Sequence, residues 1–578
     1  MFLGVEQSLT GRRWIGPSLA TERDALNLNQ HTDLPLTMCN VLARLNVAVE
    51  DIDNFLNPTL RATISDPKSL KDCSIAAEII LKAAEESRPI AIFADYDVDG
   101  GASAALLCDF LRHFSIKPTI YIPDRIDEGY GPNAEAMSAL AAEHDLIICV
   151  DCGILSYDAL ASATAADVIV LDHHLGGETL PLAKAIVNPN RQDEMGDLSH
   201  LCAAAVVFFV LIEASRQMRE NNKTPPDLLK SLDLVALATV ADVAPLIGVN
   251  RAFVRQGLKV MGYRNRVGLN ALSDISGLNA APNTYHLGYV LGPRINAGGR
   301  IGQADLGARL LCCVDPHEAN AIAEKLHELN AERRALEASV SLSAFEQAKT
   351  RGFNKALVWA ADNGWHPGVV GIVASRLKEQ TNRPTVVIGF EGDVGKGSGR
   401  SVSGVDLGVC IQKLAHDGDI EKGGGHKMAA GLSLNRSQLE PAMEKLESLL
   451  EAQGASSFGT ADLHIDGTLM LGGASLDLIE YLDQAGPYGA SAPAPRFAFP
   501  DCSISYTKVV GEAHLKVSLS DGFGTKLDAI CFGAFDSPLG DALKKAQGRK
   551  MHIVGRLETN TWGGRTRPQL RIEDANPA

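Results

Sequence analysis

The sequence predicts a mixed α/β protein with two α/β lobes joined by a long helix, followed by a small C-terminal β barrel. Three observations support this fold class. Short apolar runs alternate with helical stretches between residues 88 and 188, and a second alternation follows from 355 to 454. A stretch rich in Glu, Lys and Arg at 316–351 separates the two. Beyond residue 459 the remaining short alternating stretches are typical of β-strands.

Five short apolar runs in the first lobe have the composition of buried strands. They are Ile90–Ala94, Thr119–Ile122, Leu146–Val150, Val168–Leu171 and Ala185–Val187. Continuous apolar strands that alternate with helices indicate a parallel sheet covered by helices on both faces. Ligands of such sheets bind beyond the carboxyl ends of the strands, so the residues after each run are the first candidates for a site.

The rest of the chain divides where its hydrophobic pattern changes. A helical region covers about Leu201–Leu258, a charged connecting helix covers Pro316–Arg351, and Gly454–Gly459 has the composition of a linker. The C-terminal strands are expected at His514–Leu519, Leu527–Phe532 and Met551–Leu557. The predicted parts are an N-terminal segment at 1–65, a first α/β domain at 66–260, a helical connector at 261–350, a second α/β domain at 351–455 and a β domain at 456–578.

Length and composition favour a soluble, cytoplasmic protein of about three to four domains. The chain has 578 residues, of which 46% are hydrophobic. Met1–Trp14 has no long apolar run behind a basic start, so no secretory signal is expected. Leu201–Ala214 is too short for a bilayer, which needs about 20 apolar residues. Cys149 and Cys152 fall at an apolar strand, which disfavours a redox pair.

The net charge of −16 lowers the expectation of a nucleic-acid partner without excluding one. Local clusters of cations, rather than the total charge, decide such binding. The stretch Gly548–Ile572 is locally basic and contains Trp562, so it offers the cations and the aromatic ring that single-strand binding uses. The alternative is a β barrel with an ordinary mixed surface.

Acidic and histidine side chains follow three of the predicted strands. They are Asp95, Asp97 and Asp99 after the first run, Asp151 after the third, and Asp172, His173 and His174 after the fourth. A single Asp after a strand often forms a turn or caps a helix, so each one alone is weak evidence. Because three strand ends present such groups to one edge of one sheet, the set predicts a functional site.

Such a cluster suits divalent metal ions. Carboxylates packed together raise one another's pKa values unless cations occupy the site. Oxygen-rich ligands with one or two imidazoles suit Mn²⁺ or Mg²⁺, and two ions about 3.5–4 Å apart can activate water and bind a phosphoryl group. Asp242 lies in the apolar stretch Leu232–Val243 and is a further candidate, because an unpaired carboxylate is costly to bury there. The alternative for Asp242 is a solvent-facing residue at a helix end.

Several motifs resemble those of the DHH phosphoesterase family. In the first lobe they are DYDVDG (95–100), VDCG (150–153), DHH (172–174) and ATVADVAPL (238–246). In the second they are HPGVVGIVASRL (366–377), GSGRS (397–401) and GGGHKMAAG (423–431), which resemble the associated DHHA1 lobe. PRINAGGR (293–300) and the C-terminal β domain are similar to the branch that degrades single-stranded DNA from its 5′ end. The resemblance covers about residues 60–578.

The resemblance implies a site for two Mn²⁺ (or Mg²⁺) ions. The implied ligands are Asp97, Asp99, Asp151, His173 and Asp242. Asp151 would bridge the ions, while Asp95, Asp172 and His174 would support the ligands or take part in catalysis, since a ligating imidazole needs a partner on its other nitrogen. His174 could also protonate the leaving oxygen. Many small family members have a metal-binding His where this chain has Phe93, and its absence favours the exonuclease branch over the pyrophosphatase branch.

The resemblance also implies a pocket for the substrate and its 5′-terminal phosphate. Its members would be Arg125, Arg300, His366, Ser398, Arg400 and His426. Arginine is suited to bidentate recognition of phosphate, and glycine-rich turns let backbone amides approach it closely. Taken singly, these residues would be surface arginines and tight turns. A pocket that holds one end of the strand would explain a 5′→3′ polarity.

Together, these features predict a two-metal exonuclease that degrades single-stranded DNA 5′→3′ to nucleoside 5′-monophosphates, in recombination and repair. The C-terminal β domain resembles an OB-fold and would bind the strand. The family implies a monomer that works with single-strand-binding protein and a DNA helicase. One alternative is a phosphodiesterase of short oligonucleotides or cyclic dinucleotides, which the extra β domain disfavours. The other is a non-catalytic scaffold, which the retained ligands disfavour.

Overall fold

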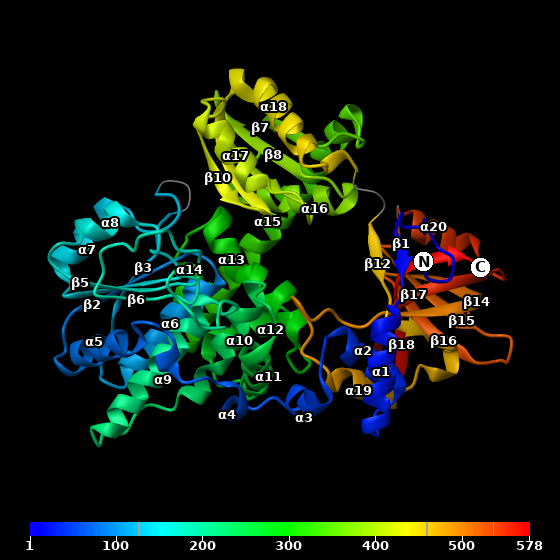
Figure 1. The fold of residues 1–578 in the computed structure, drawn as a ribbon, viewed down its shortest axis with the longest axis horizontal. Coiled ribbons are helices and arrows are strands. Elements are labelled where there is room, and N and C mark those ends of the chain that lie inside the picture. The colour runs from blue at the N-terminus through cyan, green and yellow to red at the C-terminus, as the bar shows by residue number, and fades with distance from the viewer. Residues whose placement is uncertain (125–127, 458–460, 512, 536) are drawn as a thin grey trace. The chain divides into compact units, whose positions relative to one another are not determined.

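The computed structural model describes residues 1–124, 128–457, 461–511, 513–535 and 537–578. The chain forms two compact units (Figure 1). One unit is Thr63–Phe458, and the other combines Met1–Ala62 with Gly459–Ala578. The N-terminal segment thus shares a unit with the C-terminal β domain. The end of the predicted linker, at Phe458 and Gly459, lies outside the described residues.

The first lobe is built on a five-stranded parallel sheet in the order β3-β2-β4-β5-β6. Its strands are β2 (Ile90–Ala94), β3 (Thr119–Tyr121), β4 (Leu146–Val150), β5 (Asp167–Leu171) and β6 (Ala185–Val187). Every residue of β2 and β4 is buried, as their unbroken apolar runs require. The five predicted strands and their parallel arrangement are confirmed.

Helices cover both faces of this sheet. They are α5 (Cys73–Glu85), α6 (Val98–Arg112), α7 (Ala134–Glu143), α8 (Tyr157–Ser162) and α9 (Ala203–Glu220). Figure 1 shows α7 and α8 on one side of the sheet, and α5 and α9 on the other. The apolar side chains of α7 and α8 form one core cluster with alternate residues of the strands. The sheet is therefore closed to water except at its edges and strand ends.

A helical region follows and leads to the second lobe. Its elements are η3 (Leu228–Ser231), α10 (Leu232–Ala241), α11 (Gly248–Gly262), α12 (Val267–Ile275), the π-helix η4 (His286–Leu291), α13 (Gly292–Ile301), α14 (Leu306–Cys312) and α15 (Pro316–Arg351). The predicted connecting helix is α15, which Asp315 caps. It is not solvated on all sides, because α12, α13 and α14 and then α16 and β7 pack against it.

The second lobe has a mixed five-stranded sheet in the order β10-β11-β9-β8-β7. Its elements are β7 (Val358–Asn363), α16 (Pro367–Thr381), β8 (Thr385–Glu391), β9 (Val394–Arg400), α17 (Leu407–His416), β10 (Lys422–His426), β11 (Ala429–Asn435), η5 (Arg436–Gln438), α18 (Leu439–Ala452) and η6 (Ala455–Ser457). Only β7 and β8 are parallel. Helix α16 packs in one core cluster, and α17 and α18 pack in another.

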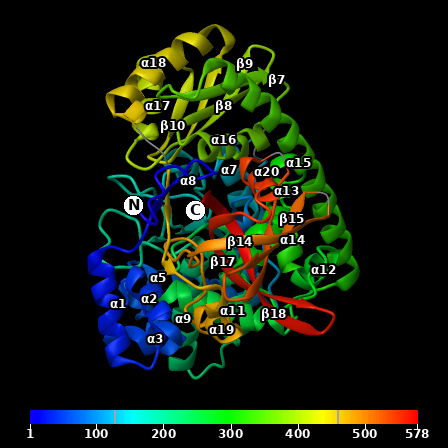
Figure 2. The ribbon, with the colours of Figure 1, turned by 90° about the vertical axis from the view of Figure 1, so that its right-hand side faces the viewer.

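The C-terminal β domain is a closed barrel (Figure 2). Its elements are β12 (Asp462–His464), β13 (Gly467–Thr468), η7 (Leu471–Gly473), α19 (Leu476–Gln484), β14 (Phe497–Val510), β15 (His514–Ser520), β16 (Lys526–Cys531), α20 (Pro538–Lys545), β17 (Lys550–Trp562) and β18 (Arg565–Pro577). The strand order is β13-β14-β15-β16-β18-β17, and pairing of β14 with β17 closes the sheet. The predicted small β barrel is confirmed.

The N-terminal segment completes this unit. It contains β1 (Arg13–Ile15), α1 (Leu19–His31), α2 (Leu36–Arg44), η1 (Val49–Asp51), α3 (Ile52–Leu56) and α4 (Leu60–Thr63), and η2 (Pro67–Ser69) follows in the other unit. Strand β1 pairs with β12, and the buried Trp14 donates from Nε1 to Asp574 at 2.9 Å. Helices α1 and α2 belong to the same apolar cluster as the barrel strands. Within the described ranges, no helix combines the length and the apolar character that a membrane crossing needs.

Candidate functional site

The carboxyl ends of the parallel strands bring the predicted acidic and histidine residues together. Strands β2, β4 and β5 are neighbours, so the residues that follow each of them meet at one edge of the sheet. Ligand atoms within 4.8 Å of one another form three groups, namely Asp95/Asp97/Asp151, Asp99/His173/Asp242 and Asp151/His173/His174. These groups contain seven of the eight predicted residues, and the eighth, Asp172, joins the cluster through its Oδ1 atom, which lies 2.8 Å from His174 Nδ1.

His173 lies at the centre of the cluster. Its Nε2 atom is 3.3 Å from Asp151 Oδ1, 3.8 Å from Asp99 Oδ2 and 3.9 Å from Asp242 Oδ2. Asp242 is the residue at the C-terminal end of α10, which brings its side chain to the sheet edge from outside the sheet. Asp242 is thus a helix-end residue, but its carboxylate faces the cluster and not the solvent.

Helix α6 begins inside the cluster. Asp97 caps it, because one carboxylate oxygen accepts from the backbone N–H groups of Asp99 and Gly100 at 2.8 and 3.1 Å. Asp99, in the first turn, is buried and accepts from the N–H groups of Ala203 and Ala204 at 2.6 and 2.8 Å. Those amides begin α9, so the positive end of that helix stabilises the Asp99 carboxylate. Two helix N-termini thus fix the orientation of these two acids.

A second set of contacts holds the histidine pair. Asp172 accepts from the N–H groups of His173 and Ile154 at 2.7 and 3.1 Å, and His174 Nδ1 lies 2.8 Å from its Oδ1. Burial opposes ionisation of Asp172, but the hydrogen bond and the charge of His174 lower the pKa of this carboxyl below its ordinary value. Burial likewise opposes protonation of His174, but Asp172 raises the pKa of the imidazole to about 9.

The carboxyl groups nearest His173 have raised pKa values, unlike that of Asp172. Burial and the neighbouring acids raise the pKa of Asp99 and raise that of Asp151 well above its ordinary value. Burial and the charge of Asp99 raise the pKa of Asp242 to about 8. Among the described residues, the buried Oδ1 of Asp151 accepts no hydrogen bond. Buried carboxylates that repel one another in this way fit a site that binds divalent cations, and the oxygen-rich ligand set fits Mn²⁺ or Mg²⁺.

The prediction from the sequence missed four residues of the site. Asn188 and Asn190 follow β6 and donate to the backbone carbonyls of His174 and His173 at 2.9 and 2.6 Å. The strand-end rule, applied to the fifth run, would have found them. Tyr130 lies within 3.3 Å of both His174 ring nitrogens and donates to the carbonyl of Asp151.

The fourth missed residue is Asn296 on α13, which accepts from the N–H of Val98 at 3.0 Å. Asn296 lies within the PRINAGGR motif (293–300), but only Arg300 of that motif was given a role. No pattern in the sequence marked Tyr130, which comes from a segment outside the sheet.

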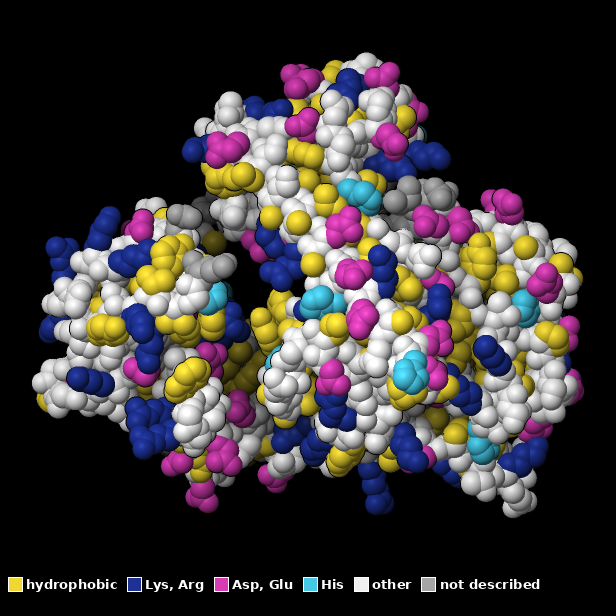
Figure 3. Space-filling model, turned by 180° about the vertical axis from the view of Figure 1, so that it is seen from behind, with side chains coloured by type: hydrophobic (Ala, Val, Ile, Leu, Met, Phe, Trp, Pro, Cys, Tyr) yellow, Lys and Arg dark blue, Asp and Glu magenta, His cyan; other side chains and the backbone are white. Residues whose placement is uncertain are grey.

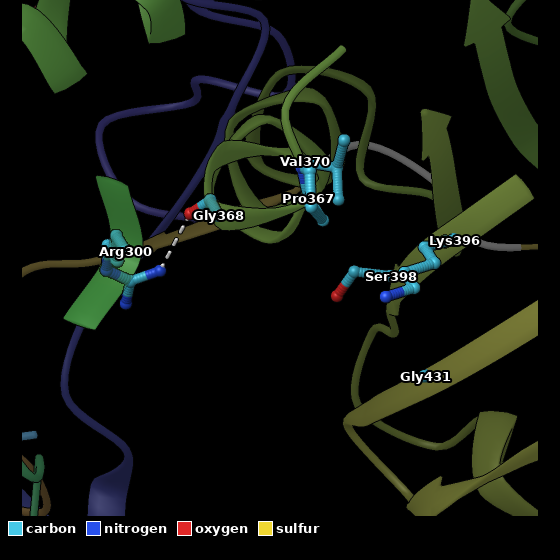
Figure 4. Close-up of a pocket in the computed structure, with 8 residues that line it drawn as sticks. Arg300, Pro367, Gly368, Val370, Lys396, Ser398 and Gly431 are labelled. Atoms are coloured by element: carbon cyan, nitrogen blue, oxygen red, sulfur yellow. Dashed lines mark hydrogen bonds between the residues drawn. The ribbon is translucent and has the colours of Figure 1, made fainter. Parts of the chain in front are cut away.

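A pocket of about 200 Å³ lies between α13 and the second lobe (Figure 4). Arg300, Pro367, Gly368, Val370, Lys396, Gly397, Ser398 and Gly431 line it. Arg300 donates to the carbonyl of Gly368 at 3.1 Å, which holds its guanidinium at the N-terminal end of α16. Lys396 was not predicted and adds a second cation to the lining. Arginine, lysine, a hydroxyl and a helix N-terminus together suit an anion.

Two further predicted residues lie around this pocket. Arg400 donates to Ser398 Oγ at 2.9 Å. A Cβ atom at Gly371 would lie 3.1 Å from both side chains, so the missing side chain leaves room for them. His366 caps α16 by accepting from the N–H of Gly368 at 3.0 Å. Arg300 and Ser398 therefore line the pocket, while His366 and Arg400 contact the lining residues Gly368 and Ser398. Their role in binding the substrate stays a prediction.

The other two predicted substrate residues are His426 and Arg125. His426 ends β10 and is exposed, and it is not one of the lining residues within the described part of the chain. Arg125 lies outside the described residues. Both remain predictions.

The barrel carries the predicted basic and aromatic stretch as a hairpin of β17 and β18. Trp562 is 86% exposed, and it pairs with Arg565 across the turn at Gly563 and Gly564. Arg567 is exposed on the same hairpin. Elsewhere, basic and acidic side chains are interspersed over the face in Figure 3, so the net negative charge does not form a single acidic surface there.

Three sequence profiles match the chain in the order of its lobes. The DHH family, N-terminal domain profile matches residues 89–239, and the DHHA1 domain profile matches 354–452. The RecJ OB domain profile matches 465–574. The predicted two lobes and the OB-like barrel are thereby confirmed.

Similar proteins agree over nearly the whole chain. The single-stranded-DNA-specific exonuclease RecJ of Dickeya dadantii is 35% identical over 94% of this chain and 97% of its own length. The chain belongs to the RecJ family. The RecJ protein of Escherichia coli is 34% identical over 87% of this chain and 90% of its own length. The resemblance seen in the motifs is thus confirmed.

A solved RecJ structure has the same fold. RecJ from Thermus thermophilus in complex with Mn²⁺ superposes with a TM-score of 0.80 and 27% identity, covering 98% of this chain and 80% of that one. Its complex with Mg²⁺ gives a TM-score of 0.73. These metal-bound RecJ structures agree with the acidic cluster in supporting a dependence on divalent metal.

Proposed function

We propose that this RecJ-family protein is a divalent-metal-dependent exonuclease that degrades single-stranded DNA 5′→3′ to nucleoside 5′-monophosphates, in recombination and repair. The observation that carries the proposal is the pairing of two sites in one unit. An acidic cluster that fits Mn²⁺ or Mg²⁺ lies at the edge of the parallel sheet, and a cationic pocket lies against α16. The named relatives act on single-stranded DNA, and the OB-like barrel suits that substrate.

The acidic cluster would hold two metal ions. Their ligands would be Asp97, Asp99, Asp151, His173 and Asp242. When bound, such ions polarise the phosphoryl group and lower the pKa of water, which supplies a nucleophile at neutral pH. The helix N-termini that fix Asp97 and Asp99 keep these ligands in place before a substrate arrives.

The His174–Asp172 pair would handle a proton. Asp172 holds His174 through Nδ1 and raises the pKa of the ring to about 9 in the metal-free site, which favours the protonated ring. The Nε2 proton is then available for a leaving oxygen. Tyr130 lies 3.2 Å from that nitrogen and would orient it. Asp95, buried at the same edge, would support the ligands rather than contact the substrate.

The cationic pocket would set the polarity. A terminal phosphate carries more negative charge than an internal one, so Arg300, Lys396 and Ser398 would hold a 5′ end in preference to the middle of a strand. The strand end would then lie at a fixed distance from the metal ligands. We further expect a cytoplasmic monomer that acts with single-strand-binding protein and a DNA helicase.

Digestion of end-labelled strands tests the proposal. A long single strand with a blocked 3′ end should be degraded to mononucleotides in Mn²⁺ or Mg²⁺, and the same strand with a blocked 5′ end should persist. A fully paired duplex should also persist. If long strands survive while dinucleotides to pentanucleotides or cyclic dinucleotides disappear, the protein is a small-substrate phosphodiesterase and the proposal is wrong.

A further inference from the structure

Helix α13 contacts the metal-ligand loop at two points. Asn296 accepts from the N–H of Val98, which lies between Asp97 and Asp99. This amide is at the first position of α6, where no acceptor exists within the helix itself. Three residues further on, a Cβ atom at Gly299 would lie 3.0 Å from Cβ, Cδ2 and the carbonyl oxygen of Tyr96. The helix therefore packs directly on the loop.

The same helix also supplies a wall of the cationic pocket. Arg300 lies one turn after Asn296, so at about 1.5 Å per residue their Cα atoms are separated by roughly 6 Å along the axis. Its guanidinium lines the pocket and bonds Gly368. One short helix thus joins the loop that carries two metal ligands to the pocket that suits a terminal phosphate.

We infer that Asn296 is a positioning residue, which fixes the distance between the metal ligands and the bound 5′ end. This inference rests on the proposed function and adds a structural cause for cutting at a fixed bond. Without the Asn296 acceptor, the Val98 amide would lose its partner and the loop could shift relative to Arg300. A displacement of about 1 Å at reacting groups can cost about 100-fold in rate.

Two variants of Asn296 separate positioning from packing. Asn296→Leu keeps the size and removes the acceptor, whereas Asn296→Asp keeps an oxygen acceptor. In Asn296→Leu we expect kcat to fall about 10- to 100-fold with KM for 5′-phosphorylated strands unchanged, and the first product to vary in length. Asn296→Asp should restore a single product length. Asn270→Leu, which removes a surface hydrogen bond to Arg264, is the matched control.

A second measurement does not depend on activity. Hydrogen exchange of the peptide that contains Val98, in metal-free protein, should be faster in Asn296→Leu and normal in Asn296→Asp. Normal exchange, kcat and product length in Asn296→Leu would overturn the inference. If wild-type protein fails to degrade single strands, the proposed function is wrong, while the exchange result still decides whether Asn296 holds the loop.

An independent observation concerns two exposed tyrosines. The rings of Tyr285 and Tyr289 stack with centroids 5.2 Å apart and an interplanar angle of 23°, although the residues are 52% and 74% exposed. Tyr289 belongs to the π-helix η4, and such short π-helices are frequent at functional sites. Gly288 and Gly292 pack on Val240 and Ala241, the residues just before Asp242. The segment that carries the tyrosines therefore packs against the end of α10, the helix that Asp242 follows.

Arg294 lies on α13, the helix that follows η4 directly in the chain. Arg294 donates to the carbonyl of Val290 at 2.7 Å and lies 3.4 Å from His327 Nδ1. Burial lowers the pKa of Arg294, and the nearby charges of Arg334 and Arg333 lower it further, so three cations lie near one another here. Stacked aromatic rings with neighbouring cations are the combination that single-stranded nucleic acid requires.

The geometry points to Tyr285 and Tyr289 as a stacking site for unpaired bases of the strand, with Arg294 on its phosphates. Removing both rings (Tyr285→Ala with Tyr289→Ala) should weaken binding of a 5′-phosphorylated 12-mer about 10-fold in EDTA. Binding of a 5′-phosphorylated dinucleotide should not change. Tyr263→Ala is the control, because Tyr263 is 72% exposed and directly follows the end of α11.

A photochemical experiment checks the contact directly. A 12-mer with 5-iodouracil should cross-link to Tyr289 or Tyr285, and not to Tyr263, when metal is absent. Unchanged 12-mer affinity in the double variant, or no cross-link, would overturn the assignment. Both measurements are made without hydrolysis, so they are independent of whether the exonuclease activity is found.

Discussion

The metal cluster and the cationic pocket are built in different ways within one unit. The cluster takes seven of its eight residues from Asp95–His174, at the ends of neighbouring parallel strands. The pocket combines Arg300 on a helix with the start of α16 and with β9 and β11 of the mixed sheet. The first arrangement follows from the topology of one sheet, whereas the second needs segments that only tertiary packing brings together.

The metal cluster and the cationic pocket also favour ions of opposite charge. The carboxylates of the cluster raise one another's pKa values, so the folded protein favours cations there. The pocket places Arg300 and Lys396 beside neutral groups, so it favours an anion. The 5′ end of a strand suits both sites, because its terminal phosphate would bind in the pocket while the next phosphodiester would bind the cations of the cluster. The comparison teaches that chemistry and end recognition can be disrupted separately.

The largest effect should come from the cluster. His173→Ala should lower kcat by at least about 1,000-fold, because bound metal supplies several kcal/mol of transition-state stabilisation. Asp99→Ala should be equally inactive and also less stable by about 1–3 kcal/mol, since two buried amides of α9 lose their acceptor. Nucleotide release and urea unfolding measure the two effects. The exposed Asp274→Ala is the control, and full activity in His173→Ala would contradict the site.

The pocket should affect end recognition more than the chemical step. Arg300→Gln should reduce the preference for a 5′-phosphate over a 5′-hydroxyl strand by about 10- to 100-fold, because a charge-assisted hydrogen bond contributes about 1.5–3 kcal/mol. Rates on the two strands, measured at limiting substrate, give this ratio. Arg264→Gln, on an exposed ion pair, should leave it unchanged. If Arg300→Gln reduced the benefit of a 5′-phosphate and of a 3′-phosphate equally, the pocket would not recognise the 5′ end specifically. The metal cluster and the pocket would then not have separate roles.

Metal should stabilise the protein more at pH 8 than at pH 5. The raised pKa values of Asp99, Asp151 and Asp242 mean that the metal-free folded state favours the protonated acids. Their stabilisation is complete below the pKa of an unfolded Asp, about 4, and is lost as the pH rises through the raised pKa of each acid, which for Asp242 is about 8. Mn²⁺ at 100 times its Kd adds about 2.7 kcal/mol where the acids are ionised. Thermal unfolding in EDTA and in Mn²⁺ at both pH values checks this, and equal shifts would contradict it.

The smallest effect is expected at the edge of the cluster. Tyr130→Phe removes the hydroxyl that contacts His174 and the Asp151 carbonyl, so kcat should fall about 3- to 10-fold. Tyr157→Phe removes a comparable hydroxyl contact, to the carbonyl of Thr179, and should have no effect. A loss of 1,000-fold in Tyr130→Phe would instead place Tyr130 among the metal-site residues.

The sequence was most informative where local pattern and fold coincide. The runs that became β2, β4 and β5 are unbroken and apolar, so both the strands and the residues after them were predictable. Strands β14 and β18 were missed because Pro500 and Pro568 and several polar residues interrupt their pattern. Asn296 and Lys396 were missed for another reason. Their roles depend on which surfaces α13 and β9 pack against, and no local spacing encodes that.

The contact between Trp14 and Asp574 has a consequence for biosynthesis. A ribosome releases Trp14 long before β18 exists, so β1 and its helices stay without their partners while Thr63–Phe458 is made. Domains generally fold as units during synthesis, so the metal-bearing unit can fold first, and the barrel unit is completed last. A message truncated within the last strand would then give a chain with an intact metal centre and an unpaired N-terminal segment, a species that quality-control proteases could recognise by its exposed indole.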